Sequence, residues 1–328
     1  MEEHDKPRML VLAGPNGSGK STVTNELKEK GLIPENYINA DDIAKKLESS
    51  MPEVNQRNLT AANMAEQARK EAVTGDKPFA FETVMSTPAK MGLFDEARRN
   101  GFQVDMVFVT TESPMINVGR VQDRVSKGGH DVAEDKIIER YGRAMDMLPA
   151  AIQKADNARV YDNSYHGVAP IMVAHKIDGV LTFPDLVKPD NMAPKDFERV
   201  QQWTQDKIRG PLEQHEKSRA ELSDLVKGVP GATVAPADVT NGATYTGRVV
   251  GATDQHVLQH IDGTKQFVLH DRTLAPPGLA AVKDRTEESI TTAYNFGADG
   301  KHAKPPTQVM GPSNDLGMDQ SGQLRAKL

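Results

Sequence analysis

A glycine-rich segment near the start of the chain limits its fold more than any other part. Residues 14–21 read GPNGSGKS, a complete G-x-x-x-x-G-K-[ST] motif, and they follow an apolar run at residues 9–13. Such a motif binds phosphate only where a buried strand aims the loop and a helix begins at its end, so that backbone N–H groups face the anion. Residues 21–30 have a helical pattern that Gly31 ends, so both flanks are present. The motif therefore predicts a strand–loop–helix unit that holds nucleotide phosphates.

Each residue type in this phosphate-binding loop (P-loop) has a defined part in binding. We expect the Lys20 ammonium to reach the β- and γ-phosphates and the Ser21 hydroxyl to ligate Mg²⁺. The glycines leave room for the phosphates. The expected nucleotide-binding residues are Gly14, Asn16, Gly17, Ser18, Gly19, Lys20, Ser21 and Thr22.

Composition excludes several other kinds of protein. The chain has 328 residues, of which 26% are charged, and its net charge of −6 gives no global attraction to nucleic acid. It has no cysteine, which excludes disulfides, thiolate nucleophiles and cysteine-based zinc sites. No signal-peptide pattern opens the sequence and no apolar run approaches membrane-spanning length. We therefore expect a soluble, cytoplasmic protein without a membrane partner.

The first half alternates strand-like and helix-like segments. Apolar runs at residues 8–13, 37–39, 78–84, 103–110 and 159–161 alternate with periodic segments at residues 58–73, 87–100, 115–126 and 134–154. This alternation predicts an α/β domain with a mainly parallel sheet covered by helices. We expect the domain to span residues 1–185.

The second half has a different pattern. Residues 186–227 form a polar segment that reads as helices broken at Gly210-Pro211, and residues 228–241 have the composition of a linker. Short strands with hairpin signals follow at residues 242–285, which predicts a small all-β module. Residues 286–328 contain few apolar side chains, so we expect a disordered or loosely attached tail.

Acidic residues follow two of the predicted strands. Asp41 and Asp42 come just after the second strand, at the sheet edge where the P-loop is expected, so one of them is a candidate general base. One of the two would also cap the helix that follows, and the two interpretations are compatible. Glu82 and Thr83 end the third strand, where the carboxylate would accept hydrogen bonds from sugar hydroxyls or form a surface salt bridge.

Arginines flank a Gly-Gly-His hinge between two predicted helices. Arg124 and Arg140 lie on either side of the hinge and would close over the phosphates as a lid. Arg120 and Arg143 are explained equally well as solvated helix residues. The hinge residue His130 would contact substrate or phosphate, or cap the next helix through a local hydrogen bond.

A polar pair ends the last predicted strand of this domain. Asp162 and Asn163 would contact the adenine or the P-loop there, or would form a plain β-turn.

The ordered set of these motifs over residues 6–180 resembles the zeta toxin family. The segments that carry the resemblance are residues 14–22, 39–41, 81–83, 124–125, 128–132, 140–141 and 161–164. The resemblance implies a P-loop kinase fold, with ATP or GTP as phosphoryl donor and Mg²⁺ as cofactor. Zeta toxins are the kinase half of many bacterial toxin–antitoxin systems, so it also implies an antitoxin partner.

The best-known zeta toxins phosphorylate the 3′-hydroxyl of the amino sugar in UDP-N-acetylglucosamine, and the resemblance implies this kind of nucleotide-sugar acceptor here. By position, Asp41 matches the family's base, Lys20 and Ser21 match its nucleotide and Mg²⁺ groups, and Glu82 matches its sugar-binding carboxylate. The expected catalytic residues are Lys20, Asp41, Arg124 and Arg140, and the expected substrate-binding residues are Glu82, Thr83 and His130. The spacing of the two arginines departs from that of the best-known members, which leaves NAD or an antibiotic open as the acceptor. A nucleotide-switched interaction protein of plasmid transfer is the alternative from another class.

Residues 240–285 resemble KfrB-type domains, which occur on proteins of conjugative plasmids. The resemblance rests on residues 245–250, 256–260 and 269–274, and it implies docking to a plasmid-transfer protein. His256, His260 and His270 lie in this module without acidic or cysteine partners in the motif. Because a spacing of four on a strand does not make ligands converge, we expect no metal site from these three.

Overall fold

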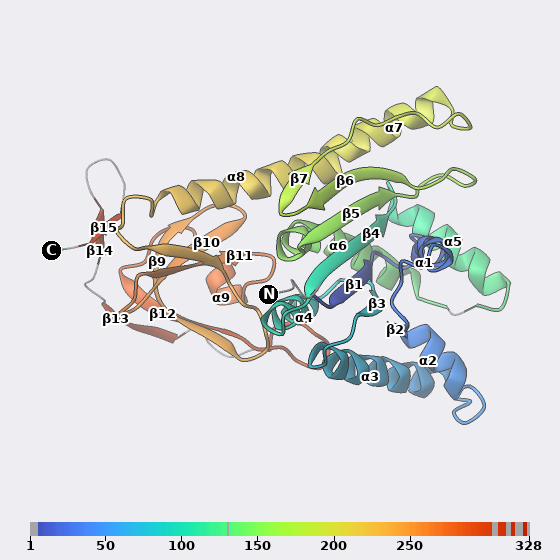
Figure 1. Cartoon of the computed structure of the whole chain (residues 1–328), viewed down its shortest axis with the longest axis horizontal. Helices are drawn as coiled ribbons and strands as arrows, with labels where there is room; N and C mark the ends of the chain where they lie inside the picture. The colour runs from blue at the N-terminus through green and yellow to red at the C-terminus, as the bar shows by residue number, and fades with distance from the viewer. Residues whose placement is uncertain (1–5, 130, 304–307, 313–315, 319–323, 327–328) are drawn as a thin grey trace. The chain divides into compact units, whose positions relative to one another are not determined.

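The computed structural model describes residues 6–129, 131–303, 308–312, 316–318 and 324–326. The described residues divide into two compact units. Unit 1 comprises Met1–Ser86 and Leu93–Ile208, and unit 2 comprises Thr87–Gly92 and Arg209–Leu328. Figure 1 labels their helices and strands.

Unit 1 is built on a sheet whose first strands are parallel. Its strands are β1 (Arg8–Ala13), β2 (Asn36–Ile38), β3 (Phe79–Thr83), β4 (Gln103–Thr110), β5 (Asn157–Asp162), β6 (Ile171–Ile177) and β7 (Val180–Thr182). They lie in the order β2-β3-β1-β4-β5-β6-β7. Strands β1 to β5 pair in parallel, whereas β6 and β7 pair antiparallel at one edge. Strands β2 and β3 lie on one side of β1, and after β3 the chain crosses to form β4 and β5 on the other side. The P-loop, which follows β1, therefore lies at a topological switch point.

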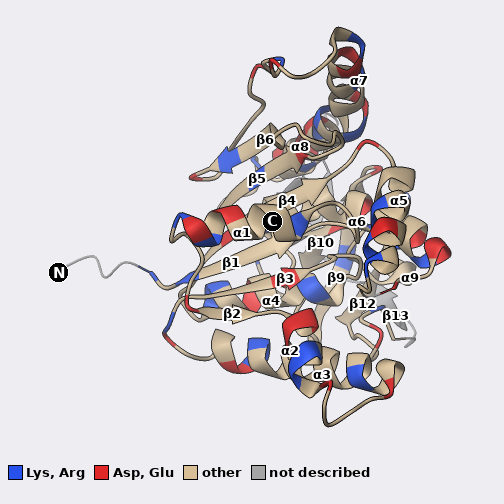
Figure 2. Ribbon diagram, turned by 90° about the vertical axis from the view of Figure 1, so that its right-hand side faces the viewer, with Lys and Arg blue, Asp and Glu red and all other residues tan. Residues whose placement is uncertain are grey.

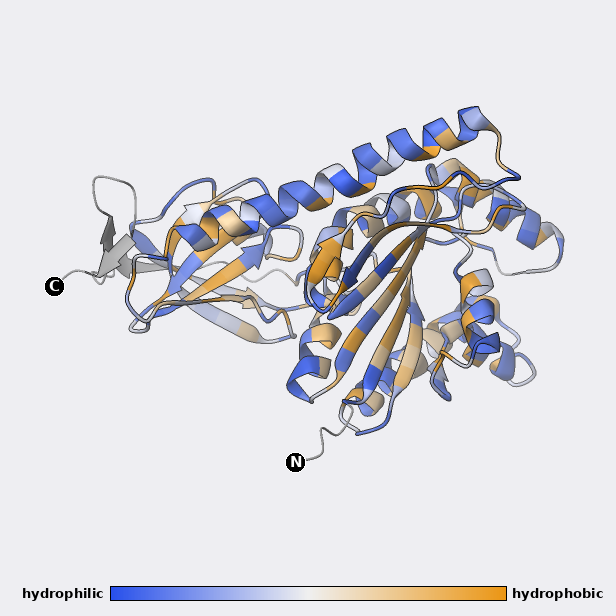
Figure 3. Cartoon of the chain, turned by 45° about the horizontal axis from the view of Figure 1, so that its top comes forward, coloured by the Kyte–Doolittle hydropathy of each residue, from blue (hydrophilic) through white to orange (hydrophobic). Residues whose placement is uncertain are grey.

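The helices of unit 1 connect these parallel strands. They are α1 (Lys20–Glu29), α2 (Ala40–Leu47), α3 (Val54–Val73), α4 (Ala89–Arg99, shared with unit 2), α5 (Pro114–Ser126), α6 (Glu134–Lys154) and α7 (Pro194–Thr204). Five of the predicted segments match them closely, and α6 has the predicted bounds. A parallel sheet covered on both faces buries almost every side chain of its strands, and residues 9–13 of β1 are all buried. Figure 3 shows hydrophobic stretches along the strands of the larger sheet. The predicted α/β fold class is confirmed.

Unit 2 pairs one long helix with a mainly antiparallel sheet. Helix α8 (Gly210–Asp224) precedes β8 (Thr233–Pro236), β9 (Ala243–Ala252), β10 (His256–Ile261), β11 (Gln266–Asp271), helix α9 (Pro277–Ala280), β12 (Glu288–Tyr294) and β13 (Gln308–Pro312). The strands lie in the order β13-β12-β9-β10-β11-β8, and β14 (Leu316–Met318) pairs separately with β15 (Leu324–Ala326). The predicted all-β module is therefore present.

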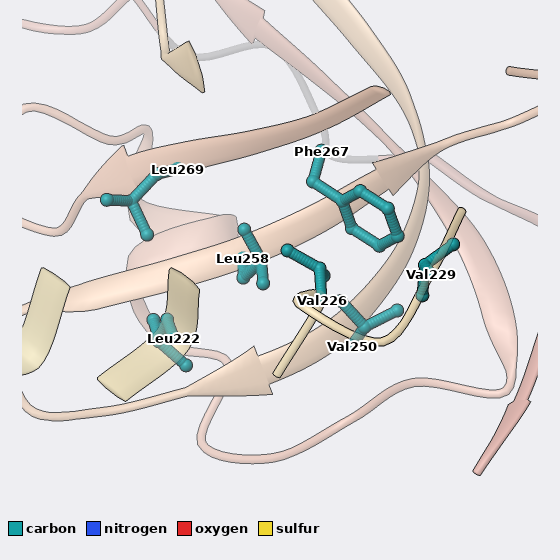
Figure 4. Packing of buried hydrophobic residues seen from close by; sticks show 7 residues of the cluster. All are labelled: Leu222, Val226, Val229, Val250, Leu258, Phe267 and Leu269. Atoms are coloured by element: carbon teal, nitrogen blue, oxygen red, sulfur yellow. The ribbon is translucent and has the colours of Figure 1, made fainter. Parts of the chain in front are cut away.

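Two apolar clusters cover the two faces of this sheet. On one face, Leu222 and Val226 pack with Val250, Leu258 and Phe267 (Figure 4). On the other face, Val249 and Val257 pack with residues around α9. Neighbouring residues of β9 and of β10 thus point to opposite faces, as the period of two in a strand requires.

The structure differs from the predicted boundaries of the module at both ends. Strand β12 lies within the predicted tail, and its Ser289, Ile290 and Tyr294 are buried against β9. Strand β8 lies within the predicted linker and pairs in parallel with β11. Both segments are short and contain few large apolar residues, so their stability comes from ladder hydrogen bonds to neighbours that composition does not reveal.

The predicted break at Gly210-Pro211 is also different in the structure. Helical turns continue from α7 through a short π-helical stretch, Gln205–Arg209, into α8. Pro211 lacks the N–H that the interior of a regular α-helix uses, and π-helical turns occur as single insertions inside α-helices. The wider π turn before it accommodates the proline without ending the helix.

Among the helices of the described residues, none has both the length and the apolar character that crossing a membrane requires.

Candidate functional site

The P-loop connects β1 to α1, and two of its glycines cannot be replaced by a residue with a side chain without strain or a clash. Gly14 and Gly17 have φ angles of 140° and 77°. A Cβ atom on Gly14 would lie 2.0 Å from the Val109 carbonyl oxygen, and one on Gly17 would lie 2.4 Å from that of Asn117. The loop therefore has the form of a tight backbone cradle that side chains would fill.

Side chains from α5 and from the end of β5 hold the last part of the loop. The Asn163 Nδ2 donates to the Ser18 carbonyl oxygen at 2.8 Å. The Arg120 guanidinium lies 3.5 Å from the same oxygen and donates to the Ser164 carbonyl oxygen at 3.3 Å. The sequence left open whether Asn163 contacts the adenine or the P-loop, or only forms a β-turn. The structure shows the contact with the P-loop.

Lys20 is the buried cation of the site. Its Nζ donates to the carbonyl oxygens of Gly14 at 2.8 Å and Pro15 at 2.9 Å, and it lies 3.9 Å from Glu82 Oε1. Burial lowers the pKa of Lys20, while the charges of Glu82 and Asp41 raise it. The ammonium is thus held inside the loop beside two carboxylates.

Asp41 lies exposed in the first turn of α2, which also holds Asp42. Figure 2 shows acidic residues in red on α2. The cap of this helix is Asn39, whose Oδ1 accepts from the Asp41 backbone N–H at 2.8 Å. The interpretation in which Asp41 or Asp42 caps the helix is therefore wrong. The side chain of Asp41 is not used for capping, and its charge acts on Lys20.

Glu82 is oriented at the end of β3 by two donors. The Tyr37 hydroxyl donates to its Oε2 at 3.1 Å, and the Asn39 Nδ2 lies 3.3 Å from the same oxygen. Burial and the neighbouring Glu82 raise the pKa of Tyr37, so that hydroxyl remains a donor at neutral pH. Thr83 uses its hydroxyl within its own turn, since Oγ1 accepts from the Met85 N–H at 3.1 Å.

The four candidate arginines differ in what they contact. Arg140 lies 3.4 Å from the Asn16 Oδ1 of the P-loop, and the charge of the exposed Arg124 acts on Lys20. Arg143 donates to the Ser86 carbonyl oxygen at 3.0 Å and pairs with Glu139 on its own helix. The sequence explained Arg120 equally well as a lid residue or as a solvated helix residue. In the structure, its guanidinium contacts the Ser18 carbonyl oxygen near the end of the P-loop.

The hinge residue His130 lies outside the described residues.

Asp162 is a buried carboxylate beside the loop whose role sequence did not resolve. It ends β5 and is 2% exposed. The Ser164 hydroxyl donates to its Oδ1, and its Oδ2 has no hydrogen-bond partner among the described residues. Burial raises the pKa of Asp162 to about 6. A strand that ends in Asp-Asn-Ser in the same sheet as the P-loop strand, one strand beyond its neighbour β4, is the signal that points to this position.

The residues at this sheet edge fit a nucleoside triphosphate with Mg²⁺. The cradle would be blocked by any added Cβ, and the buried Lys20 supplies a cation inside it. Ser21 is an exposed residue in the first turn of α1, so its hydroxyl would be available to ligate Mg²⁺.

Comparisons with known proteins support two families. The Zeta toxin family matches residues 1–167, and the KfrB domain matches residues 244–282. A protein of Haemophilus influenzae described as uncharacterized is 28% identical over 134 residues, which is 41% of this chain and 92% of that protein.

A comparison with solved structures also found matches. The AvrRxo1-ORF1:AvrRxo1-ORF2 complex with sulphate ions has a TM-score of 0.42 at 14% identity and covers 62% of this chain and 76% of that one. The PezAT chromosomal toxin-antitoxin system of Streptococcus pneumoniae has a TM-score of 0.39 at 12% identity and covers 65% of this chain and 89% of that one.

Proposed function

Since the chain belongs to the zeta toxin family of kinase-like phosphotransferases, we propose that it transfers the γ-phosphoryl group of ATP or GTP to a hydroxyl of a nucleotide-sugar. UDP-N-acetylglucosamine is the first candidate for that acceptor. One observation carries the proposal: the buried Lys20 ammonium at the start of α1 lies 3.9 Å from the Glu82 Oε1, and the charges of Asp41 and Arg124 also act on its pKa. A phosphate site, a carboxylate for the acceptor and a further cation thus share one sheet edge, which is what phosphoryl transfer needs.

Asp41 is the general base in this mechanism. Its exposed carboxylate accepts the proton of the acceptor hydroxyl, while the hydroxyl oxygen forms the new bond to the γ-phosphorus. The bond from the γ-phosphorus to the bridging oxygen breaks, and the nucleoside diphosphate leaves with that oxygen. The products are the phosphorylated acceptor, the diphosphate and one proton on Asp41.

The cations compensate charge on the group in transfer. Lys20 gives up its contacts with the Gly14 and Pro15 carbonyl oxygens and binds phosphate oxygens instead. Arg140 and Arg124 approach from the other side of the loop, where Arg140 already meets Asn16. When bound at Ser21, Mg²⁺ supplies further charge compensation on the phosphate oxygens.

Glu82 positions the acceptor. Tyr37 and Asn39 donate to one of its oxygens, so the other oxygen, which lies 3.9 Å from Lys20, is held near the transferred group. A carboxylate fixed in this way accepts hydrogen bonds from sugar hydroxyls, and the half-buried Tyr37 and Asn39 side chains resist its rotation.

Family membership also supports partners for the two parts of the chain. We propose that an antitoxin restrains the kinase in the cytoplasm and that the KfrB domain docks to a plasmid-transfer protein.

A direct test measures transfer by mass. The purified chain is incubated with ATP and Mg²⁺ together with UDP-N-acetylglucosamine, NAD or no acceptor. We expect UDP-N-acetylglucosamine to gain one phosphate and ATP turnover to depend on it. If only NAD is phosphorylated, NAD and not the nucleotide-sugar is the acceptor. If the chain binds nucleotide tightly but shows no acceptor-dependent turnover, it is a nucleotide-switched protein and not a kinase.

A further inference from the structure

Unit 2 contains a closed cluster of two imidazoles and a carboxylate, outside the residues of the proposed kinase site. His215 lies on α8, His256 begins β10 and Asp271 ends β11. Each offers a ligand atom, and these atoms lie within 4.8 Å of one another. All three side chains are buried, at 3%, 0% and 7% exposure.

One nitrogen in this cluster has no hydrogen bond. The His256 Nδ1 lies 2.7 Å from the Ser218 hydroxyl, whereas its Nε2 is buried and has no partner among the described residues. A buried polar atom without a partner costs free energy, and such atoms are rare in folded proteins. The His256 ring therefore presents an unused lone pair or N–H inside a cluster of ligand-type groups.

We propose that this cluster is a transition-metal site that binds one Zn²⁺ through His215, His256 and Asp271. Two imidazole nitrogens and one carboxylate oxygen are a common protein ligand set for zinc. Mg²⁺ and Ca²⁺ prefer all-oxygen coordination, so the two imidazoles select against them.

The contacts around the cluster are those that orient metal ligands. Ser218 holds the His256 Nδ1 and so fixes the His256 ring, which offers a nitrogen within 4.8 Å of the ligand atoms of the other two residues. The Thr273 backbone N–H donates to the Asp271 Oδ1 at 2.7 Å, which leaves Oδ2 for the cluster. Ligating imidazoles and carboxylates in proteins are typically fixed by such outer hydrogen bonds.

Binding requires one small rearrangement. The His215 Nε2 lies 2.6 Å from the Asp271 Oδ2, which is a hydrogen bond, whereas two ligands of a tetrahedral zinc lie about 3.3 Å apart. The ion takes the place of the hydrogen that these two atoms share, and the His215 imidazole then carries its N–H on Nδ1.

The proposed ion would join α8 to two strands of the sheet. The chain has no cysteine, so neither a disulfide nor a thiolate zinc site is available for that purpose. The two other histidines of the sheet have different partners: His260 lies 2.8 Å from the Thr264 carbonyl oxygen, and His270 lies between Tyr294 and Gln259. His256 lies instead with Asp271 and with His215, which comes 56 residues before Asp271 in the sequence.

The test measures metal binding by the full chain without nucleotide. The metal-free protein is titrated with ZnCl₂ alone by calorimetry, and with CoCl₂ to record the visible spectrum that distinguishes tetrahedral from octahedral coordination. We expect one equivalent of Zn²⁺, a tetrahedral Co²⁺ spectrum, and no comparable binding of Ca²⁺.

Variants assign the ligands. His215→Gln and His256→Gln should weaken Zn²⁺ binding by about 100-fold or more, and Ser218→Ala, which removes an outer hydrogen bond, by about 10–100-fold. His260→Gln is the matched control, because it alters a buried histidine of the same strand outside the cluster, and it should keep full affinity.

Three results would overturn the proposal: no stoichiometric Zn²⁺ binding by the wild-type chain, an octahedral Co²⁺ spectrum, or equal binding by His215→Gln and the wild type. The first two need no variant, so they decide the question even if a substituted chain fails to fold.

Discussion

Each unit contains a buried carboxylate at the end of a strand, and the two differ in the sign of their pKa shift. Burial raises the pKa of Asp162 in unit 1 to about 6 even though one of its oxygens accepts from Ser164, and the other oxygen has no partner among the described residues. Burial would also raise the pKa of Asp271 in unit 2, but the hydrogen bond and charge of His215 lower it below the usual value. Partners, and not burial alone, therefore decide what a buried carboxylate can do.

The units also differ in where their polar groups lie. In unit 1 the groups proposed for catalysis come from the ends of strands and the starts of helices, and Asp41 and Arg124 are exposed to a substrate. In unit 2 the histidine cluster is sealed within the sheet and α8. We infer that unit 1 is arranged for turnover and unit 2 for binding an ion or a partner.

The largest expected effect is on catalysis in unit 1. Lys20→Ala removes the buried cation of the P-loop and should lower phosphoryl transfer by about 10³-fold or more. The exposed Lys46→Ala is the control for loss of a lysine and should keep wild-type activity. Acceptor-dependent ADP release measures the activity of both variants. If Lys20→Ala remains active, unit 1 does not catalyse the transfer.

Two neighbouring aspartates separate the base from a general charge effect. Asp41→Asn should lower kcat by about 10²–10⁴-fold with nucleotide affinity retained, because only the proton acceptor is lost. Asp42→Asn changes the next residue in the same exposed turn and should stay close to wild type. Equal losses in both variants would contradict the role of Asp41.

Leu258→Ala tests whether unit 2 supports the kinase. Leu258 is fully buried between α8 and the sheet, so its truncation should lower the stability of unit 2 by about 2–5 kcal/mol. We expect the kinase activity of the folded variant to be unchanged. Urea unfolding followed alongside ADP release checks this, and a parallel loss of activity would show that the division between the units is not functional.

Asp162→Asn gives the smallest effect and sharpens the contrast between the two carboxylates. Because folding raises the pKa of Asp162 from 3.8 to about 6, its stabilising contribution is complete below pH 4 and is lost as pH rises through 6. The wild type should therefore lose up to about 3 kcal/mol relative to Asp162→Asn between pH 4 and pH 7.

The measurement is the free energy of unfolding of both chains in urea across that range. Asp76→Asn, which removes an exposed negative charge, is the control. Stability curves of the wild type and Asp162→Asn that stay parallel with pH would disprove the assignment.

Much of unit 1 is predictable from sequence because its signals are local. The P-loop motif gives its own position, and the alternation of strands and helices brings Asp41 and Glu82 to the same edge. The choice among Arg120, Arg124, Arg140 and Arg143 is not local, because all four lie on helices and only packing decides which guanidinium meets the loop. The contact of Arg120 with Ser18 therefore appears only in the structure.

Unit 2 is less predictable because its key contacts join distant segments. A short strand such as β8 or β12 has no strong pattern of its own and is stable only when a neighbour supplies the ladder. In the sequence, His215 is a single polar residue in a helical segment. Only the packing of α8 on the sheet brings it to His256 and Asp271.

By itself, the sequence determined the P-loop, the α/β class of unit 1, the family and the presence of a β module, since each depends on local motifs and on their order along the chain. Only the tertiary structure decided that Asn39 rather than an aspartate caps α2, that Arg120 holds the end of the loop, and that His215 meets His256 and Asp271. Those outcomes depend on which side chains face one another across separate elements, and the free energy of such contacts is set by packing rather than by local pattern.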